Sequence, residues 1–489
     1  MEIRTTLFNE IAEKEIRNPY ARAFLKAMPA AIAARRKTVM GSFPDPDAAQ
    51  ACGQAIRAEV VAWLPELLEE FEKNALARGA KILWARDAGE ANEMVLAIAK
   101  ERNVTYVTKG KSMVTEEIGL NDALAESGIE PFETDLGEFI AQQLKRPPFH
   151  IVGPAINVPV EEVCDLFMEK AGMEKPTTDP VELGYAARLF LRDKFHHVAL
   201  GVTGVNMAVA ETGTIINLEN EGNIRFNKSS PRTQVSIMSL EKVVPTMEDA
   251  MHLTRLLSRN CTGQAISAYV SMDSGPKKPG EIDGPEELFI IIVDNGRSEI
   301  YADSVAREAL RCIRCGGCLN ICPVYAKIGG YPYGWAYSGP MGQVLTPLLL
   351  GLDRTQDLYR ACTLCGSCRE VCPAGVDHPS MFLYYRSKDV EEDRGLRGKK
   401  RPWKESRFFD LWSRAVTHSA LWNLGFRLAR PLVNRYSHSG VITRMGGYFE
   451  GWFRTRNLPA IAKETFHERW KRLRRETAPG GQNGRKGKP

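Results

Sequence analysis

The chain has 489 residues, more than a single hydrophobic core usually organises, so we expect two or three domains. Its composition, with 44% hydrophobic and 26% charged residues, is ordinary for a soluble globular protein. No window holds the roughly 18 consecutive apolar residues of a membrane helix, and the first residues lack the apolar segment of a signal peptide. These features disfavour the secreted and membrane-spanning classes and predict a cytoplasmic protein.

The charge is distributed unevenly along the chain. Residues 386–489 contain 25 Lys and Arg against 10 Asp and Glu, a net charge of +15. Because the whole chain carries +5, residues 1–385 carry −10. A mildly acidic body therefore precedes a strongly basic tail, a pattern typical of an interaction segment.

Residues 1–75 are predicted to be helical. Apolar residues recur there at helical spacing, and a break at Gly41–Pro46 separates two helical stretches. The apolar stripe before the break comprises Leu7, Ile11, Ile16, Phe24 and Leu25.

From residue 76, strand-like and helical segments alternate, which predicts an α/β domain with a parallel sheet covered by helices. The expected strands are Lys81–Ala85, Val104–Thr108, Pro131–Thr134, Phe149–Gly153 and Leu288–Asp294. The expected helices are Glu90–Arg102, Ser112–Glu126, Leu136–Lys145 and Glu182–Phe195.

Eight of the eleven cysteines form an internal repeat. Cys312–Pro323 and Cys362–Pro373 both have the form C-x2-C-x2-C-x3-C-P, the bacterial ferredoxin spacing in which the fourth cysteine ligates the other [4Fe–4S] cluster. We expect small residues between ligands to let backbone N–H groups approach the sulfurs. The predicted ligands are Cys312, Cys315, Cys318 and Cys372 for cluster 1, and Cys362, Cys365, Cys368 and Cys322 for cluster 2.

Zinc is the alternative metal, but zinc ligands usually come as two separated pairs rather than four cysteines within eleven residues. With all eight cysteines used as ligands, neither cluster has an open iron, which favours an electron relay over catalysis. The scattered Cys52, Cys164 and Cys261 are expected to be buried small hydrophobic residues.

The α/β segment offers few catalytic candidates. Gly110-Lys111-Ser112 resembles the end of a phosphate-binding loop, but Thr105 occupies the position that requires the first glycine. His196 and His197 lack further metal ligands and are expected to be structural. Glu211 is interpreted as a solvated or capping glutamate, with a ligand or general base as the alternative. Polar groups converging around Glu211, Asn206 and Lys109 would indicate an enzyme that binds a phosphate or CoA ester.

Three segments beside the cysteine repeat carry a family resemblance. They are Val107–Val114 (VTKGKSMV), Thr203–Thr214 (TGVN…ETGT) and Tyr331–Pro340 (YPYGWAYSGP), and with the repeat they resemble the lactate utilization protein B family. The resemblance covers nearly the whole chain. It implies an iron–sulfur subunit of a bacterial three-protein system that oxidises L-lactate to pyruvate, with two [4Fe–4S] clusters held by the eight cysteines. It also implies an N-terminal domain similar to sugar-phosphate isomerase and CoA-transferase folds, but no catalytic residue. An iron–sulfur subunit of another 2-hydroxy-acid oxidase, such as glycolate oxidase, is the alternative.

These features together predict an α/β domain, then an α-helical dicluster ferredoxin domain and a helical basic tail. The predicted regions are a helical extension at 1–75, the α/β domain at 76–297, the dicluster domain at 298–392, the basic tail at 403–475 and a disordered end at 476–489. Residues 393–402 are the expected linker.

The tail is predicted to present an aromatic stripe beside its arginines, which favours docking onto the other subunits of a lactate-oxidation complex. The stripe comprises Phe408, Leu411, Trp412, Ala415, Ser419 and Trp422. Peripheral association with the inner face of the membrane and packing on the chain's own body are the alternatives. Nucleic acid is disfavoured because no recognition module accompanies the charge.

Overall fold

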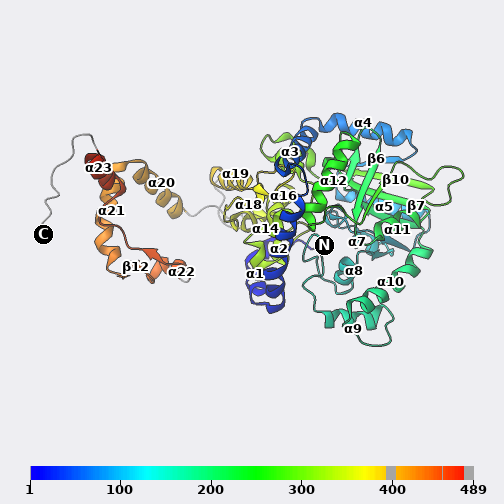
Figure 1. Ribbon diagram of the computed structural model, residues 1–489, viewed down its shortest axis with the longest axis horizontal. Helices are drawn as coiled ribbons and strands as arrows, with labels where there is room; N and C mark the ends of the chain where they lie inside the picture. The colour runs from blue at the N-terminus through cyan, green and yellow to red at the C-terminus, as the bar shows by residue number, and fades with distance from the viewer. Residues whose placement is uncertain (1, 393–402, 454, 478–489) are drawn as a thin grey trace. The chain divides into compact units, whose positions relative to one another are not determined.

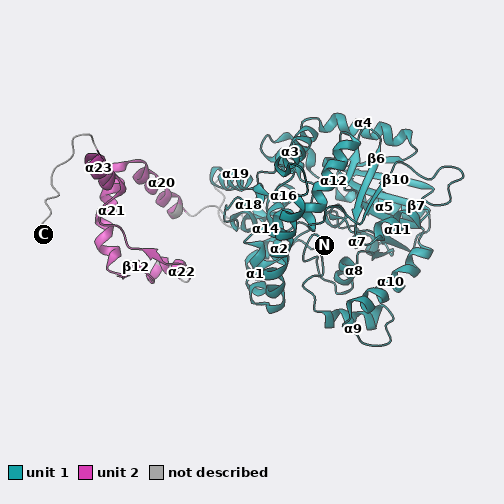
Figure 2. Cartoon of the chain, in the orientation of Figure 1, with its two compact units in different colours: residues 1–399 teal, residues 400–489 magenta. Residues whose placement is uncertain are grey.

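The computed structural model describes residues 2–392, 403–453 and 455–477. The chain forms two compact units, Met1–Lys399 and Lys400–Pro489 (Figure 2). The predicted linker at 393–402 and the end at 478–489 lie outside the described residues. No helix in the described ranges has both the length and the apolarity to cross a membrane.

A six-stranded parallel sheet organises the larger unit, in the order β1-β10-β7-β4-β2-β3 (Figure 1). The strands are β1 Lys81–Ala85, β2 Tyr106–Lys109, β3 Glu130–Glu133, β4 Leu200–Gly204, β7 Thr233–Ser239 and β10 Glu287–Val293. The predicted parallel-sheet α/β architecture is confirmed.

Strand β10, which lies between β1 and β7, is apolar from Leu288 to Val293 because both of its faces are covered. Ile290 and Ile292 point into a core shared with α4 (Leu64–Ala77), whereas Ile291 and Val293 point into a core shared with α5 (Ala88–Glu101). A strand buried on both faces has no need for polar alternation. The run of apolar residues in this segment follows from that position.

A second, four-stranded sheet in the order β8-β5-β6-β9 lies within the same unit. Its strands are β5 Met207–Val209, β6 Thr214–Glu219, β8 Val243–Val244 and β9 Tyr269–Asp273. The turn between β5 and β6 requires Gly213, because its φ is 66° and a Cβ there would lie 2.3 Å from the backbone nitrogen of Ala75.

The remaining helices cover the sheets and form the cysteine-rich region. Before β10 they are α1 Phe8–Arg17, α2 Pro19–Met40, α3 Pro46–Ala62, α6 Met113–Glu117, α7 Leu120–Glu126, α8 Leu136–Gln143, α9 Val160–Lys170, α10 Pro180–His197, α11 Asn223–Ser229 and α12 Met247–Cys261. After it they are α13 Arg297–Ala302, α14 Gly317–Ile321, α15 Tyr325–Ile328, α16 Gly339–Leu350, α17 Gln356–Arg360, α18 Ser367–Glu370 and α19 His378–Glu391.

The predicted N-terminal helices pack against the cysteine-rich region, and α2 lies beside α14 (Figure 1). The predicted break at Gly41–Pro46 separates α2, which ends at Met40, from α3, which begins at Pro46. The Asp45 side chain accepts the N–H of Ala48 and caps α3. The predicted stripe is partly wrong, because Leu7 and Ile16 are exposed and the buried face of α1 carries Phe8 instead.

The predicted strand Phe149–Gly153 is also wrong. This segment forms bends, because Nδ1 of His150 accepts the N–H of Val152 at 3.0 Å and Phe149 donates its N–H to the carbonyl of Pro154 at 2.8 Å. These local bonds satisfy the backbone without a neighbouring strand.

The smaller unit is helical with a minor sheet, as predicted for the basic tail. Its elements are α20 Trp403–Thr417, α21 Ser419–Asn434, α22 Glu450–Phe453, α23 Phe466–Thr477 and the antiparallel strands β11 Ser437–His438, β12 Val441–Ile442 and β13 Leu458–Pro459. His418 has extended backbone angles and separates α20 from α21. The predicted aromatic stripe therefore spans two helices rather than one.

Candidate iron–sulfur site and the adjoining cavity

The two cysteine loops have the same backbone conformation. Arg314 and Leu364 adopt left-handed φ values of 60° and 56°, and Gly316 and Gly366 follow with 73° and 83°. Each glycine is then followed by a short helix, α14 or α18. Left-handed non-glycine residues are uncommon and cluster at functional sites. The sequence repeat is therefore also a structural repeat.

Backbone N–H groups point at sulfurs in both motifs. Arg314 donates to Sγ of Cys312 and Leu364 to Sγ of Cys362, both at 3.3 Å, at equivalent places in the two loops. Tyr325 donates to Sγ of Cys322 at 3.5 Å, and Val376 to Sγ of Cys372 at 3.4 Å. Such donors stabilise negative charge on sulfur.

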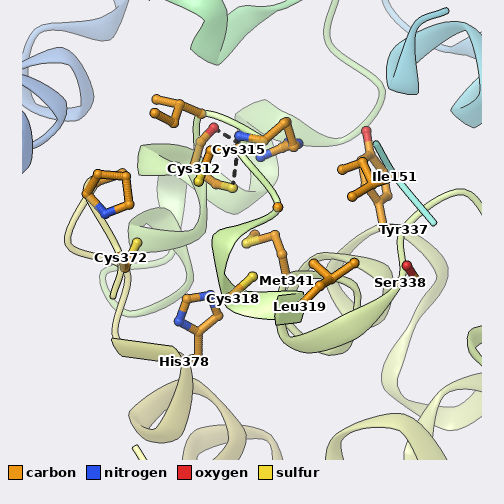
Figure 3. Close-up of a pocket in the computed structure, with 15 residues that line it drawn as sticks. Ile151, Cys312, Cys315, Cys318, Leu319, Tyr337, Ser338, Met341, Cys372 and His378 are labelled. Atoms are coloured by element: carbon orange, nitrogen blue, oxygen red, sulfur yellow. Dashed lines mark hydrogen bonds between the residues drawn. The ribbon is translucent and has the colours of Figure 1, made fainter. Parts of the chain in front are cut away.

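Four cysteines from both motifs surround one cavity (Figure 3). They are Cys312, Cys315, Cys318 and Cys372. Burial, followed by the Cys312 thiol, raises the pKa of Cys372 to about 11. The first three cysteines of the first motif thus lie with the last cysteine of the second.

The other four cysteines form a second group that is partly open to solvent. Burial and then the neighbouring Cys322, Cys362 and Cys365 raise the pKa of Cys368 to about 12. Cys365 is exposed, and the backbone N–H of Ser367 lowers the pKa of its thiol. The first group is more enclosed than the second.

The first group has the chemistry of a multi-iron cluster site, since no group of three or more His, Cys, Asp or Glu side chains among the described residues could hold a single metal ion. Burial and mutual repulsion oppose ionisation of Cys315, Cys318 and Cys372, raising the pKa of each thiol, so a cation is needed to hold them as thiolates. Nδ1 of His378, which lines the same cavity, is buried and has no hydrogen-bond partner among the described residues. Burial lowers the pKa of His378 to about 4, so its imidazole is neutral at pH 7. A buried set of four sulfur donors fits an iron–sulfur cluster.

Glu211, Asn206 and Lys109, the three candidates in the α/β region, do not converge on one site. Lys109 is fully buried and paired with Glu116 at 3.0 Å and Glu133 at 2.6 Å. Oε2 of Glu211 accepts the N–H of Met247, the first residue of α12, as expected for a capping glutamate.

The remaining sequence candidates occupy ordinary positions. His196 and His197 are exposed on the last turn of α10. Cys164 is buried as predicted, but Cys52 is exposed, so that prediction is wrong. Cys261 is half-buried and lines a polar cavity that the sequence did not reveal.

This polar cavity has a volume of about 240 Å³ and lies where three parallel strands end. Lys111 and Ser112 follow β2, Asn206 follows β4, and Ser239 ends β7. The carboxyl edge of a parallel sheet is the usual place for a ligand site. The only signal in the sequence was the position of these polar residues just after apolar strands.

Comparisons with known proteins agree along the chain. Residues 68–293 match the family model of the LUD domain, residues 308–376 that of the 4Fe-4S dicluster domain, and residues 384–475 that of the lactate utilisation protein B C-terminal region. Lactate utilization protein B of Anoxybacillus flavithermus is 38% identical over 469 residues, covering 96% of this chain and 98% of the relative. That of Bacillus cytotoxicus is 40% identical over 419 residues, covering 86% and 87%. The chain belongs to the lactate utilization protein B family.

A crystal structure of a DUF162 family protein from Deinococcus radiodurans aligns with 47% of this chain and 98% of its own, at 16% identity and a TM-score of 0.25. The family assignment depends on the sequence relatives.

A buried ion network joins the LUD domain to the first cysteine loop. Arg297 binds both carboxylate oxygens of Glu117 at 2.7 Å and reaches Glu241 at 2.9 Å. Glu241 in turn binds Arg314, the residue between Cys312 and Cys315, at 2.7 Å. Burial opposes ionisation of Glu241, but Arg297 and Arg314 hold its pKa at about 2.

Arg57 of α3 anchors the same region from the N-terminal helices. It is fully buried and donates to the carbonyl oxygens of Leu310 and Arg311, before the first cysteine, and of Glu241 and Val243, after β7. One side chain thus connects three parts of the chain that are far apart in sequence. Sequence reasoning missed these charges because arginine and glutamate are mostly exposed.

We predict that Glu117→Gln lowers the free energy of unfolding by about 3–5 kcal/mol, because removing one partner leaves the buried Arg297 incompletely compensated. Thermal and denaturant unfolding of the variant would measure the loss. The matched control is Glu13→Gln, which removes an exposed pair with Arg17 and should change stability by less than about 0.5 kcal/mol. Equal effects of the two substitutions would contradict the prediction.

Proposed function

We propose that this protein is an electron-transfer subunit that relays electrons from L-lactate oxidation through two [4Fe–4S] clusters to partner subunits. The observation that carries the proposal is the division of the eight cysteines into two groups, each combining three residues of one motif with one residue of the other. The dicluster-domain match and the names of the curated relatives support it.

The proposed ligands follow these groups. The first cluster is assigned to Cys312, Cys315, Cys318 and Cys372, and the second to Cys362, Cys365, Cys368 and Cys322. When bound, each cluster accepts and releases one electron at a time. The chain's own residues hold the thiolates, offer backbone N–H groups to them, and place Arg314 beside the enclosed first group.

We assign the exit of electrons to the second group. Cys365 is exposed, and Ile321 and Leu364, which adjoin cysteines of this group in sequence, are each 37% exposed. Exposed apolar residues beside an accessible cofactor suit the weak docking of a redox partner. In this assignment, electrons pass through the cluster of the enclosed first group before they reach the cluster of the second group.

Anaerobically prepared protein should contain about eight irons and eight sulfides per chain. Cys372→Ser should lower the iron content to about four and alter the signal of the first cluster, because this residue lies with Cys312 rather than with its own loop. Iron analysis and electron paramagnetic resonance (EPR) spectroscopy would measure both effects. Cys52→Ser, an exposed cysteine outside the motifs, is the control. Damage confined to the second cluster, or stoichiometric zinc, would refute the assignment.

The proposed function itself is tested by lactate-dependent reduction. Mixed with its partner subunits, the protein should show bleaching of its cluster absorbance when L-lactate is added, and a weaker response to glycolate. The chain alone should not oxidise L-lactate with an artificial acceptor, since the sequence contains no flavin or nicotinamide fingerprint. Reduction by glycolate in preference to lactate would move the assignment to another 2-hydroxy-acid oxidase, and turnover by the isolated chain would overturn the relay.

We further propose that the basic tail docks an acidic partner subunit. Within its own unit, α20 exposes aromatic and arginine side chains together, including Phe408, Trp412, Arg407 and Arg414, and α21 exposes Trp422. Tryptophan and arginine are common anchors of protein interfaces.

A chain that lacks residues 403–489 should keep both clusters but lose co-purification with the partner subunits. Pull-down and iron analysis would report the two properties separately. Normal assembly by the truncated chain would exclude docking through the tail. Loss of its clusters would show that the tail packs on its own body.

A further inference from the structure

The polar cavity at the carboxyl edge of the sheet contains charges of both signs, but its acidic groups are already engaged. The side chain of Glu219 accepts the N–H groups of Ile224 and Arg225 at 2.7 and 3.1 Å. Asp135 caps α8 through the N–H of Glu138 at 3.1 Å, and Glu221 accepts the N–H of Leu136 at 3.1 Å. These carboxylates support the walls of the cavity.

Two lysines of the lining are not engaged in this way. Lys111 and Lys242 are half-buried and line the cavity, yet neither forms a hydrogen bond or salt bridge with any described residue. Arg314, the third cation of the lining, is held by Glu241. The two lysines are therefore the charged groups of the lining whose hydrogen-bond donors are unused, which favours a ligand with anionic acceptor oxygens.

A buried acceptor without a partner lies in the same wall. Asn217 is 2% exposed and donates through Nδ2 to the carbonyl of Gly204 at 2.8 Å. Its Oδ1 has no hydrogen-bond partner among the described residues. An unsatisfied buried acceptor costs about 1–3 kcal/mol, and a ligand that donates a hydrogen bond would recover that energy.

We propose that this cavity binds a small 2-hydroxy carboxylate, with Lys111 and Lys242 supplying charge for the carboxylate and Oδ1 of Asn217 accepting the hydroxyl hydrogen. The volume of about 240 Å³ suits a ligand of a few non-hydrogen atoms and is below the range of pockets that hold larger cofactors or CoA esters. Naming the ligand as a hydroxy acid rests on the proposed function. The cation pair and the free acceptor do not depend on it.

The cavity adjoins the enclosed cysteine group. Ile151, Arg314 and Tyr337 line both the polar cavity and the cavity surrounded by Cys312, Cys315, Cys318 and Cys372. A bound anion would therefore lie beside residues that also line the proposed site of the first cluster. Its charge disfavours an added electron there, so binding should lower the reduction potential of the first cluster more than that of the second.

The test is equilibrium binding to the full-length, cluster-loaded chain without partner subunits, under anaerobic conditions. L-lactate should bind at least about tenfold more tightly than propionate, which lacks the hydroxyl and leaves Asn217 unsatisfied. Inorganic phosphate is the third probe. Lys242→Met should weaken lactate binding by about tenfold or more, whereas Lys175→Met, an exposed lysine outside the cavity, should not change it.

A second measurement is the potential of each cluster, titrated with and without lactate. Equal binding of lactate and propionate, tighter binding of phosphate, or equal behaviour of the two lysine variants would overturn the proposal. If the Lys242→Met variant fails to load clusters, the proposal is judged by the binding of lactate, propionate and phosphate to the unsubstituted chain. If lactate reduces the clusters in the presence of partner subunits but does not bind to this chain alone, the proposed lactate site is refuted and the proposed function stands. If lactate binds to this chain but does not reduce the clusters in the presence of partner subunits, the proposed function is refuted and the lactate site stands.

Discussion

The arrangement of this protein depends on the buried ion network that runs from Glu117 through Arg297 and Glu241 to Arg314. Burying four charges is costly, and the cost is offset only when each charge meets opposite charges at hydrogen-bond distance. Unlike an apolar contact, such a network fixes direction as well as proximity. It therefore sets where the first cysteine loop sits against the end of the sheet.

This constraint explains why the cysteine site and the polar cavity share a wall. Arg314 contributes its backbone N–H to Sγ of Cys312 and its guanidinium to Glu241, so one residue belongs to both the loop and the network. Tyr337 donates its hydroxyl to Glu117 at 2.5 Å and lines both cavities. The LUD domain thus does more than support the dicluster domain, because its strand ends form one side of the space beside the first cysteine group.

The sequence predicted what local patterns determine. Lys81–Ala85 was predicted with its observed bounds, and the strand containing Ile290–Ile292 within one residue at each end, because apolar strand segments with clear boundaries are recognisable. Phe149–Gly153 failed because an apolar run also suits a bend whose bonds are made by His150. The buried ion network could not be predicted from the sequence, since Glu117 and Arg297 are 180 positions apart and their charges resemble those of surface residues. The cluster ligands remain predictions that chemistry must test.

The two cysteine loops have the same backbone conformation. Any difference between the clusters that they are proposed to hold must therefore come from the surroundings of each loop. The N–H groups of Arg314 and Leu364 approach their sulfurs at the same distance of 3.3 Å. Around the first group the nearby cation Arg314 and low solvent access act in opposite directions, because the cation favours an added electron and desolvation disfavours it. Around the second group, where Cys365 is exposed, water screens both effects. The potential of a cluster in the first group is therefore the one that a charge in the adjoining cavity would change, whereas water would shield a cluster in the second group from that charge.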